Sequence, residues 1–412
     1  MFSYCDPVNS FPAKGPRARG AWYKPPALST EILVVATEAS ADLHAARVLA
    51  ELRALRPGIR AFGVGGPRLR AEGLEALRRA EEMSVMGVAE VLPKIPVILG
   101  ILRDLKAAAA QRRPALALLV DSPDFNLRLA ERLKRLGVKV IYYVSPSVWA
   151  WRRRRVRTIA RVVDRMLCIL PFEEGFYRES GVSARFVGHP LLERPPPGPP
   201  GPYRARLGLA EEGTTVALLP GSRRAELRRI FPPMLEAAER ILARHPGAQF
   251  VVPVASTLGE EALRPYLRRH ASLKVVLHAG ETEVALGASD AALVKSGTAV
   301  LETALMRRPM VVIYRLSWLS YLVGRLFVRL AHFALVNLVA GRTLVPELLQ
   351  GQASPARMAE ELELILQDGP PREKQLRGFE EVRAALGAPG APRRVAEEVA
   401  ALLAPSSGEA SP

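Results

Sequence analysis

The sequence predicts a two-domain α/β protein in which each domain is built on a parallel β-sheet. From Glu31 onward, short apolar runs alternate with segments of helical periodicity, a pattern typical of repeated strand–helix units. Residues 193–203 interrupt the alternation with six prolines and two glycines, which suit a linker better than a helix interior or a central strand. The alternation then restarts. Two such halves joined by a hinge predict a cleft between them.

The individual elements follow from the apolar runs. In the first half, strands are expected at residues 32–36, 61–66, 116–120, 138–144, 166–170 and 183–188, with helical patterns at 41–55, 67–77 and 126–137. In the second half, strands are expected at 215–221, 248–255 and 273–280, followed by a strand–helix–strand unit within 290–315. The predicted organisation is a flexible N-terminal extension (1–30), a first domain (31–192), the linker (193–203), a second domain (204–370), C-terminal helices that pack back on one of the halves (371–404) and a tail (405–412).

The composition is that of a folded protein, since 49% of the 412 residues are hydrophobic and 24% are charged. The two cysteines, Cys5 and Cys168, exclude a disulfide framework and a thiolate metal cluster, and they fit a reducing cytoplasm. The formal charge of +17 favours acidic partners, although an arginine-rich genome would produce the same excess. No motif for reading nucleic acid accompanies the charge, so we expect no nucleic-acid partner.

No segment has the apolar length that a membrane-spanning helix needs. The longest candidate, residues 316–340, is broken by Arg325 and Arg329. The first 26 residues have no apolar core of the kind found in signal peptides. We therefore expect a cytoplasmic enzyme.

Residues 216–226 run from a strand through a turn into a helix and have the features of a phosphate-binding turn. Gly221 permits a tight turn, Ser222 is expected to cap the helix, and Arg223 lies at the helix entrance. Free N–H groups and the helix dipole favour an anion there, and a guanidinium can bind a diphosphate with two hydrogen bonds. An ordinary capped surface turn is the alternative.

A second turn of the same kind contains Ser296, Gly297 and Thr298, which offer backbone and hydroxyl donors at the start of a helix. Glu302 lies one helical turn after Thr298 on the same face, where a carboxylate can accept both hydroxyls of a ribose. The alternative is a capping box, for which Glu302 lies one residue too far along the chain.

The first half supplies a candidate base. Asp121 is expected at the carboxyl end of a buried strand, where ligands meet open α/β sheets. Asp124, just after Pro123, is expected to cap the following helix or to lie in its first turn. Asp121 is thereby left to face the cleft and to take a proton from an attacking sugar hydroxyl. The alternative is a buried carboxylate bonded to loop amides.

For two further features the sequence allows more than one role. Trp149 and Trp151 stand beside Arg152 and the three arginines after it, an arrangement that suits a sugar face, a phosphate, a membrane rim or a solvated helix start. His189, just before the linker, is either a hinge residue or a contact to the donor.

Taken together, these segments resemble the lipid A disaccharide synthases, which are glycosyltransferases of the GT-B architecture. The matching pieces run in order from about residue 37 to residue 350: TEASADLHAA, FGVGGPRLRAEG, MSVMGVAEVLPKI, VDSPDFN, YYVSPSVWAWRRRR, LPFEEGFY, FVGHPLLE, LLPGSRRAEL, KSGTAVLETAL, PMVVIYR and NLVAGRTLVPELLQ. VSPSVWAWR and LLPGSR are the most specific of them. The resemblance implies two Rossmann-like domains facing across a cleft, the first for the acceptor and the second for a UDP-sugar.

The family joins UDP-2,3-diacylglucosamine to 2,3-diacylglucosamine 1-phosphate with inversion, giving the β-1,6-linked disaccharide 1-phosphate of lipid A and UDP. By resemblance, Asp121 deprotonates the acceptor's 6-hydroxyl, and no metal or cofactor is needed because arginine and helix ends replace the metal. The residues implied in substrate binding are Ser40, Asp42, Gly221, Ser222, Arg223, Ser296, Gly297, Thr298, Glu302, Asn337, Arg342, Glu347 and Gln350.

Two alternatives to this function stay open. One is another UDP-sugar transferase of the same architecture with a different lipid acceptor, such as a peptidoglycan lipid. The other is a basic, non-catalytic protein that binds nucleic acid or a membrane surface.

The chain departs from the family's pattern at two places. Thr37 and Ala41 stand where the family's first turn has glycines, and Val336 replaces a proline of the last element. Ala41 is tolerable if position 41 already lies in the first helical turn; otherwise it costs stability or narrows the site.

A lipid substrate gives a meaning to two apolar segments with basic residues, 90–110 and 318–338. Either can lie in an anionic membrane surface, which predicts a peripheral enzyme on the inner face of the inner membrane. Burial in the core or a homodimer contact is the alternative.

Overall fold

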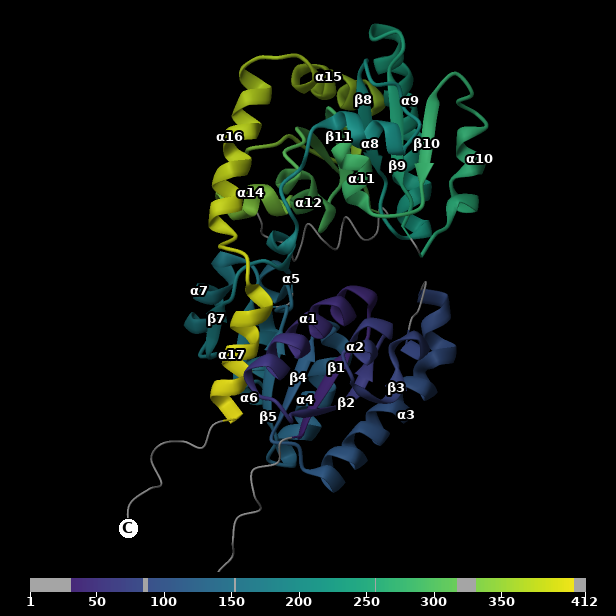
Figure 1. Ribbon diagram of the computed structural model, residues 1–412. Coiled ribbons are helices and arrows are strands. Elements are labelled where there is room, and N and C mark those ends of the chain that lie inside the picture. The colour runs from purple at the N-terminus through teal and green to yellow at the C-terminus, as the bar shows by residue number, and fades with distance from the viewer. Residues whose placement is uncertain (1–30, 84–87, 152, 256, 317–330, 404–412) are drawn as a thin grey trace, which may run out of the picture.

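The protein consists of two stacked α/β domains with two helices running along one side of both (Figure 1). This computed structural model describes residues 31–83, 88–151, 153–255, 257–316 and 331–403. The predicted N-terminal extension and C-terminal tail lie outside these ranges, and so does most of the second apolar segment.

The first domain is a seven-stranded parallel sheet. Its strands lie in the spatial order β3 (Glu75–Arg79), β2 (Arg60–Gly65), β1 (Glu31–Ala36), β4 (Leu116–Val120), β5 (Lys139–Tyr143), β6 (Arg165–Cys168) and β7 (Ala184–Phe186). Its helices are α1 (Ala39–Leu55), α2 (Pro67–Ala71), α3 (Val88–Arg112), α4 (Pro123–Arg135), α5 (Val148–Trp151), α6 (Val156–Val162) and α7 (Pro171–Glu179), with short 3₁₀ turns at Ala80–Met83, Arg153–Arg155 and Pro190–Glu193. The strand order reverses between β1 and β4, where doubly wound sheets bind their ligands.

The second domain repeats this topology with six parallel strands. They lie in the order β10 (Lys274–His278), β9 (Gln249–Pro253), β8 (Thr215–Leu219), β11 (Ala291–Lys295), β12 (Met310–Tyr314) and β13 (Glu347–Leu349). The helices are α8 (Pro200–Arg206), α9 (Arg224–Arg244), α10 (Arg264–Leu267), α11 (Thr282–Gly287), α12 (Ala299–Leu305), α14 (Leu335–Ala340), α15 (Pro355–Leu366) and α16 (Pro370–Ala385), with 3₁₀ turns at Glu260–Ala262 and Gln350–Gln352. Here the order reverses between β8 and β11.

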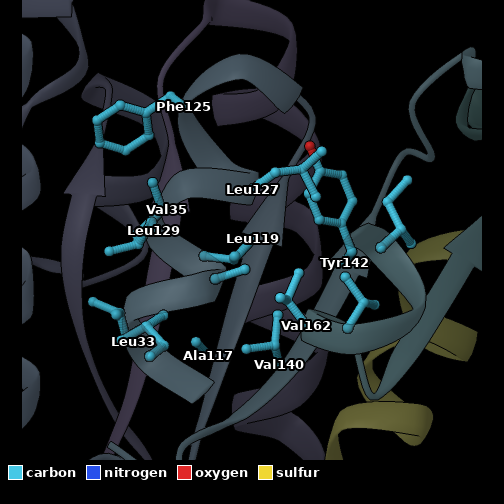
Figure 2. Packing of buried hydrophobic residues seen from close by; sticks show 14 of the residues in the cluster. Leu33, Val35, Ala117, Leu119, Phe125, Leu127, Leu129, Val140, Tyr142 and Val162 are labelled. Carbon is cyan, nitrogen blue, oxygen red and sulfur yellow. The ribbon is translucent and has the colours of Figure 1, made fainter. Parts of the chain in front are cut away.

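The central strands are buried on both faces, which is why they appear in the sequence as unbroken apolar runs. Leu33 and Val35 of β1 pack on one side with Leu119 and with Phe125 at the start of α4, as Figure 2 shows. The alternate residues of β1, Ile32, Val34 and Ala36, belong to a second cluster on the opposite side, together with α1. The fold class predicted from the sequence is confirmed by the two doubly wound sheets.

Two local expectations are corrected, and one further strand had not been expected. The helical pattern at 67–77 forms only the short α2 and then the edge strand β3. The predicted linker ends in helix α8, because Pro200 and Pro202 lie in its first turn, where proline is tolerated. Strand β13, at the far edge of the second sheet, was not expected.

The chain crosses between the domains twice. After α16, which packs against α12 and α14 of the second domain, the chain returns to the first domain as α17 (Ala391–Leu403). This helix packs against α1, and its Val395 and Val399 join the first domain's apolar cluster (Figure 1). Of the predicted C-terminal helices, α17 therefore packs back on the other domain and α16 does not.

Candidate active site

The carboxyl-terminal edges of the two sheets share one apolar cluster at the domain junction. Trp149 and Leu170, which follow β5 and β6 of the first sheet, belong to the same cluster as Val300 of α12 and Val336 of α14 in the second domain. The strand ends of the two domains therefore lie on the sides that the domains turn toward each other.

Asp121 and Glu38 come together at the switch point of the first sheet. Glu38 follows β1 and Asp121 follows β4, and these strands are neighbours. Burial, and after it the charge of Glu38, raise the pKa of the Asp121 carboxyl to about 6, against a hydrogen bond from the Ser122 backbone that lowers it. A carboxyl group with such a pKa is suited to accept a proton near neutral pH.

A chain of hydroxyl groups joins the two loops. Thr37 donates to the Ser122 hydroxyl at 2.7 Å, and Ser122 donates to Glu38 Oε1 at 3.3 Å. Thr37, one of the departures from the family pattern, is thus a hydrogen-bond donor that glycine could not replace. Ala41 lies inside α1 and is fully buried, and its φ is not positive, so its side chain is accommodated.

The backbone at Asp121 is strained. Asp121 and Ser122 have φ of +54° and +46°, in the left-handed region that non-glycine residues rarely adopt. The Asp121 carbonyl accepts hydrogen bonds from the Tyr142 hydroxyl and, at 2.8 Å, from Asn126 Nδ2. The Asp121 amide donates to the Tyr143 carbonyl at 3.0 Å. These contacts fix the backbone from which the carboxyl group projects. Asp124 lies in the first turn of α4, as expected.

Of the two residues expected to bind substrate near β1, one is committed elsewhere. The Asp42 carboxylate, 2% exposed, accepts hydrogen bonds from the amides of Gly66, Arg68 and Leu69 at 2.7, 3.0 and 3.1 Å. It therefore satisfies the start of α2, a structural role. Ser40 is exposed in the first turn of α1, beside Glu38.

The Gly221 turn (residues 220–223) follows β8 at the switch point of the second sheet. Gly221 has φ of +105°, so it needs glycine as expected. Ser222 does not cap α9, because the helix begins one residue later, with Arg223 at the cap position. The Ser222 carbonyl instead accepts from Thr257 Oγ1 at 2.8 Å. The Arg223 side chain is 79% exposed, so an anion can reach it, and one of its guanidinium nitrogens lies 3.7 Å from Glu226 Oε1.

The Ser296 turn (residues 296–298) follows β11, the neighbour of β8. The Ser296 hydroxyl donates to the Phe333 carbonyl at 2.9 Å. Thr298 makes no side-chain capping bond to α12, so the capping box is not formed. Glu302 points to the linker, where Arg194 lies 3.3 Å from it, and burial raises the Glu302 pKa.

The last motif that resembles the family, residues 337–350, mainly supports the surrounding backbone. Asn337, fully buried, accepts from the amides of Leu344 and Val345 and donates to Glu347 at 2.8 Å. Glu347 also accepts from the amides of Phe333 and Ala334. These bonds hold the segment that meets Ser296.

The other two residues of that element lie apart. Gln350 accepts from the Leu316 amide at 2.7 Å, beside the undescribed residues 317–330. Arg342 is paired at 2.6 Å with Glu381 of α16 on the surface. It is not brought to either turn.

Glu173 organises the loop after β5. This carboxylate, 1% exposed, accepts from the Ser145 hydroxyl at 2.6 Å, from Trp149 Nε1 at 3.0 Å and from the Leu170 amide at 3.2 Å. Burial raises its pKa to about 7. Trp149 is therefore a buried partner of Glu173; the side chain of Trp151 lies outside the described residues.

His189 lies in the hinge. It is 4% exposed, its amide donates to the Leu386 carbonyl at 3.0 Å, and its Nδ1 accepts from the Leu191 amide. The hinge interpretation is the one its contacts support.

Four charged residues of the site were not predicted: Glu38, Glu173, Glu226 and Lys295. Glu226 and Lys295 lie within the two turn motifs, and the motif KSGT contained the signal for Lys295. In the described ranges no group of three or more His, Cys, Asp or Glu side chains is placed to hold a metal ion. None of the described helices is long and apolar enough to cross a membrane.

Two facing doubly wound domains with nucleotide-type turns are the arrangement of GT-B glycosyltransferases. The structure resembles that of CalG4, the calicheamicin glycosyltransferase, with a TM-score of 0.57 and 18% identity over 90% of this chain and 98% of that one. A likeness at this identity speaks for the fold alone.

The sequence carries the assignment further. The model of the lipid-A-disaccharide synthetase family matches residues 32–395, and the chain belongs to that family. It is 67% identical to the lipid-A-disaccharide synthase of Anaeromyxobacter dehalogenans strain 2CP-1, over 92% of this chain and 99% of the relative. It is 56% identical to that of Myxococcus xanthus, over 91% and 98%. The predicted family and its glycosyltransferase class are confirmed.

Proposed function

We propose that this enzyme transfers a 2,3-diacylglucosaminyl group from UDP to 2,3-diacylglucosamine 1-phosphate, giving the β-1,6-linked disaccharide 1-phosphate and UDP. Family membership supports the reaction. The structural observation that carries the mechanism is the placement of Asp121, with a raised pKa, against Glu38 at the first sheet's switch point.

In this mechanism the Asp121 carboxylate removes the proton from the acceptor's 6-hydroxyl. The hydroxyl oxygen attacks the anomeric carbon from the face opposite to UDP, so the configuration inverts. The proton moves to Asp121, and the electron pair of the broken bond leaves with the diphosphate. A neighbouring carboxylate keeps Asp121 a better base than an isolated aspartate, because like charges disfavour the ionised form.

The second domain is proposed to hold the donor. Arg223 and the amides of the Gly221 turn would bind the diphosphate, and the Ser296 turn would meet the rest of the nucleotide. The negative charge that leaves with UDP is thereby stabilised by fixed hydrogen-bond donors. In many enzymes such electrostatic stabilisation makes the largest single contribution to the rate enhancement. Glu302 can serve a ribose only if Arg194 releases it, since the two are 3.3 Å apart.

A peripheral location at an anionic membrane, on the cytoplasmic face of the inner membrane, fits the acylated substrates. Ile95 and Leu99 of α3 are exposed and lie one helical turn apart on the same face, so they form a small apolar patch, and Arg103, 81% exposed, lies one turn further along that face. Such a patch beside cations suits a lipid interface, although the same patch would serve a homodimer. Sedimentation with vesicles of anionic or zwitterionic lipid, set beside the oligomeric state in solution, distinguishes the two.

The reaction is tested by incubating the protein with UDP-2,3-diacylglucosamine and 2,3-diacylglucosamine 1-phosphate. Release of UDP and formation of the disaccharide are expected together. A second reaction mixture contains UDP-N-acetylglucosamine and a peptidoglycan lipid acceptor. Turnover only in that mixture would replace the proposal by the alternative UDP-sugar transferase, and turnover in neither would remove it.

A further inference from the structure

Glu226 and Lys295 form an ion pair between the two turns of the second domain. Lys295 ends β11, directly before the Ser296 turn, and Glu226 lies in the first turn of α9, directly after the Gly221 turn. The Lys295 ammonium lies 3.0 Å from Glu226 Oε1. Both side chains are partly accessible, at 19% and 18%.

The carboxylate of Glu226 also reaches the other parts of the Gly221 turn. It lies 3.7 Å from an Arg223 guanidinium nitrogen. A Cβ added to Gly221 would be 2.6 Å from Glu226 Oε2, so this oxygen packs directly against the turn's backbone. One negative group thus contacts both cations and the glycine that a diphosphate would approach.

Tyr314 completes the cluster. Its ring lies 6.0 Å from the Lys295 ammonium. Burial raises the Tyr314 pKa, the charge of Glu226 raises it further, and the charge of Arg223 lowers it. The tyrosine hydroxyl therefore senses the same two charges, which places all four groups in one electrostatic environment.

We infer that Lys295 is a second cation for the donor's diphosphate and that Glu226 competes with the diphosphate for both Lys295 and Arg223. This inference rests on the proposed function, because it assigns a role within the same nucleotide site. The Glu226 carboxylate lies beside the Gly221 turn, in the place where we expect the diphosphate to bind. Nucleotide binding then requires that the carboxylate give up its contacts, so it lowers the affinity for UDP and for any other diphosphate there.

The competing role and a purely structural role predict opposite signs. If Glu226 competes, Glu226→Gln removes a repelling charge close to the diphosphate and strengthens UDP binding by about 3- to 10-fold. If the ion pair only holds the turn in shape, the same change weakens binding or leaves it unaltered. Lys295→Gln is expected to weaken UDP binding by roughly 10-fold, because a charge-assisted contact is lost.

The measurement is the Kd for UDP by titration calorimetry on the full chain. The double variant Glu226→Gln/Lys295→Gln separates direct from indirect effects. A direct Lys295 contact makes it bind more weakly than Glu226→Gln alone, whereas a Lys295 that serves only Glu226 gives equal binding. Glu174→Gln on α7, which breaks an ion pair with Arg178 in the first domain, is the matched charge control and should bind as the wild type does.

The outcomes separate the two proposals. If the wild type binds no UDP, the proposed nucleotide donor fails and the inference fails with it. If the wild type binds UDP but Glu226→Gln binds it equally or less tightly, the inference alone is overturned. Uridine provides the last check: because it has no phosphate, its affinity should change less than twofold in either single variant, and a change as large as that for UDP would indicate a distorted pocket.

Discussion

Glu193, at the first crossing of the chain between the domains, holds the start of helix α17, which follows the second crossing. One carboxylate oxygen of Glu193 accepts from the amides of Gly390 and Ala391 at 2.7 and 3.0 Å. Arg394 of α17 donates to the carbonyl of Val187, which directly follows strand β7, at 2.8 Å. The two chain crossings are therefore tied to each other, and they must move as a unit in any change of the angle between the domains.

Replacing Glu193 by alanine should leave those two amides without their acceptor. We expect a loss of about 1–2 kcal/mol in the free energy of unfolding, measured by urea denaturation. Glu397→Ala removes an exposed ion pair with Arg393 on the same helix and should cost less than about 0.5 kcal/mol. Equal losses in the two variants would mean that Glu193 does not anchor α17.

Asp121→Asn should keep UDP affinity and lose most turnover, by roughly 10²- to 10⁴-fold, because the base is removed while the shape is retained. Near-native turnover in this variant would exclude Asp121 as the base. UDP binding measured on the same preparation controls for folding of the second domain.

The pKa of Asp121 sets a pH dependence. Because the base must be ionised, kcat/KM should be level above pH about 6 and fall about tenfold per unit below it. The stability effect has the opposite sign. The folded-state pKa is raised from 3.8 to about 6, so this group's contribution to stability is fully present below pH 3.8 and is lost as the pH rises through 6. A rate that stays level down to pH 4.5 would contradict the assignment.

Asp42→Asn distinguishes a structural aspartate from a substrate contact. Asparagine has only one side-chain oxygen, so it cannot accept all three hydrogen bonds. We therefore expect a loss of about 2–3 kcal/mol in the free energy of unfolding. The variant molecules that remain folded should show little change in the KM for the acceptor sugar. An unchanged stability together with a raised KM would restore the substrate role predicted from the sequence.

Protonation of Glu173 should change the fluorescence of Trp149, because the indole N–H of Trp149 donates a hydrogen bond to the Glu173 carboxylate. The pKa of about 7 predicts a transition in tryptophan fluorescence near that pH. Glu173→Gln should abolish it, while Glu174→Gln, one residue along α7, should leave it in place. A transition that persists in Glu173→Gln would have to come from another group.

The strands were predictable where burial on both faces leaves an unbroken apolar run, as in β1 and β4. β3 was missed because it is an edge strand with the sequence EALRR, which has no such run. The prolines of residues 193–203 suggested a linker throughout, yet proline in a helix's first turn replaces only an N–H that has no partner in the helix.

The site was predictable one turn at a time. Asp121 follows from its place at a strand end, but its pairing with Glu38 needs the strand order, because the two residues are far apart in the sequence and become neighbours only through β1 and β4. The same holds for Glu226 and Lys295, which meet through β8 and β11. Ser222 was expected as a cap because serine favours that position, and the helix starts one residue later.

The return of α17 to the first domain has a consequence for how the chain is made. The apolar face of α1 is covered by Val395, Ala396 and Val399, which follow β7 by about 200 residues. At bacterial synthesis rates of roughly 5–20 residues per second, that interval lasts about 10–40 s. During that interval, the first domain would expose this apolar face while the chain is still attached to the ribosome. The last helix therefore completes the core of the first domain only when translation ends, after the second domain has been made.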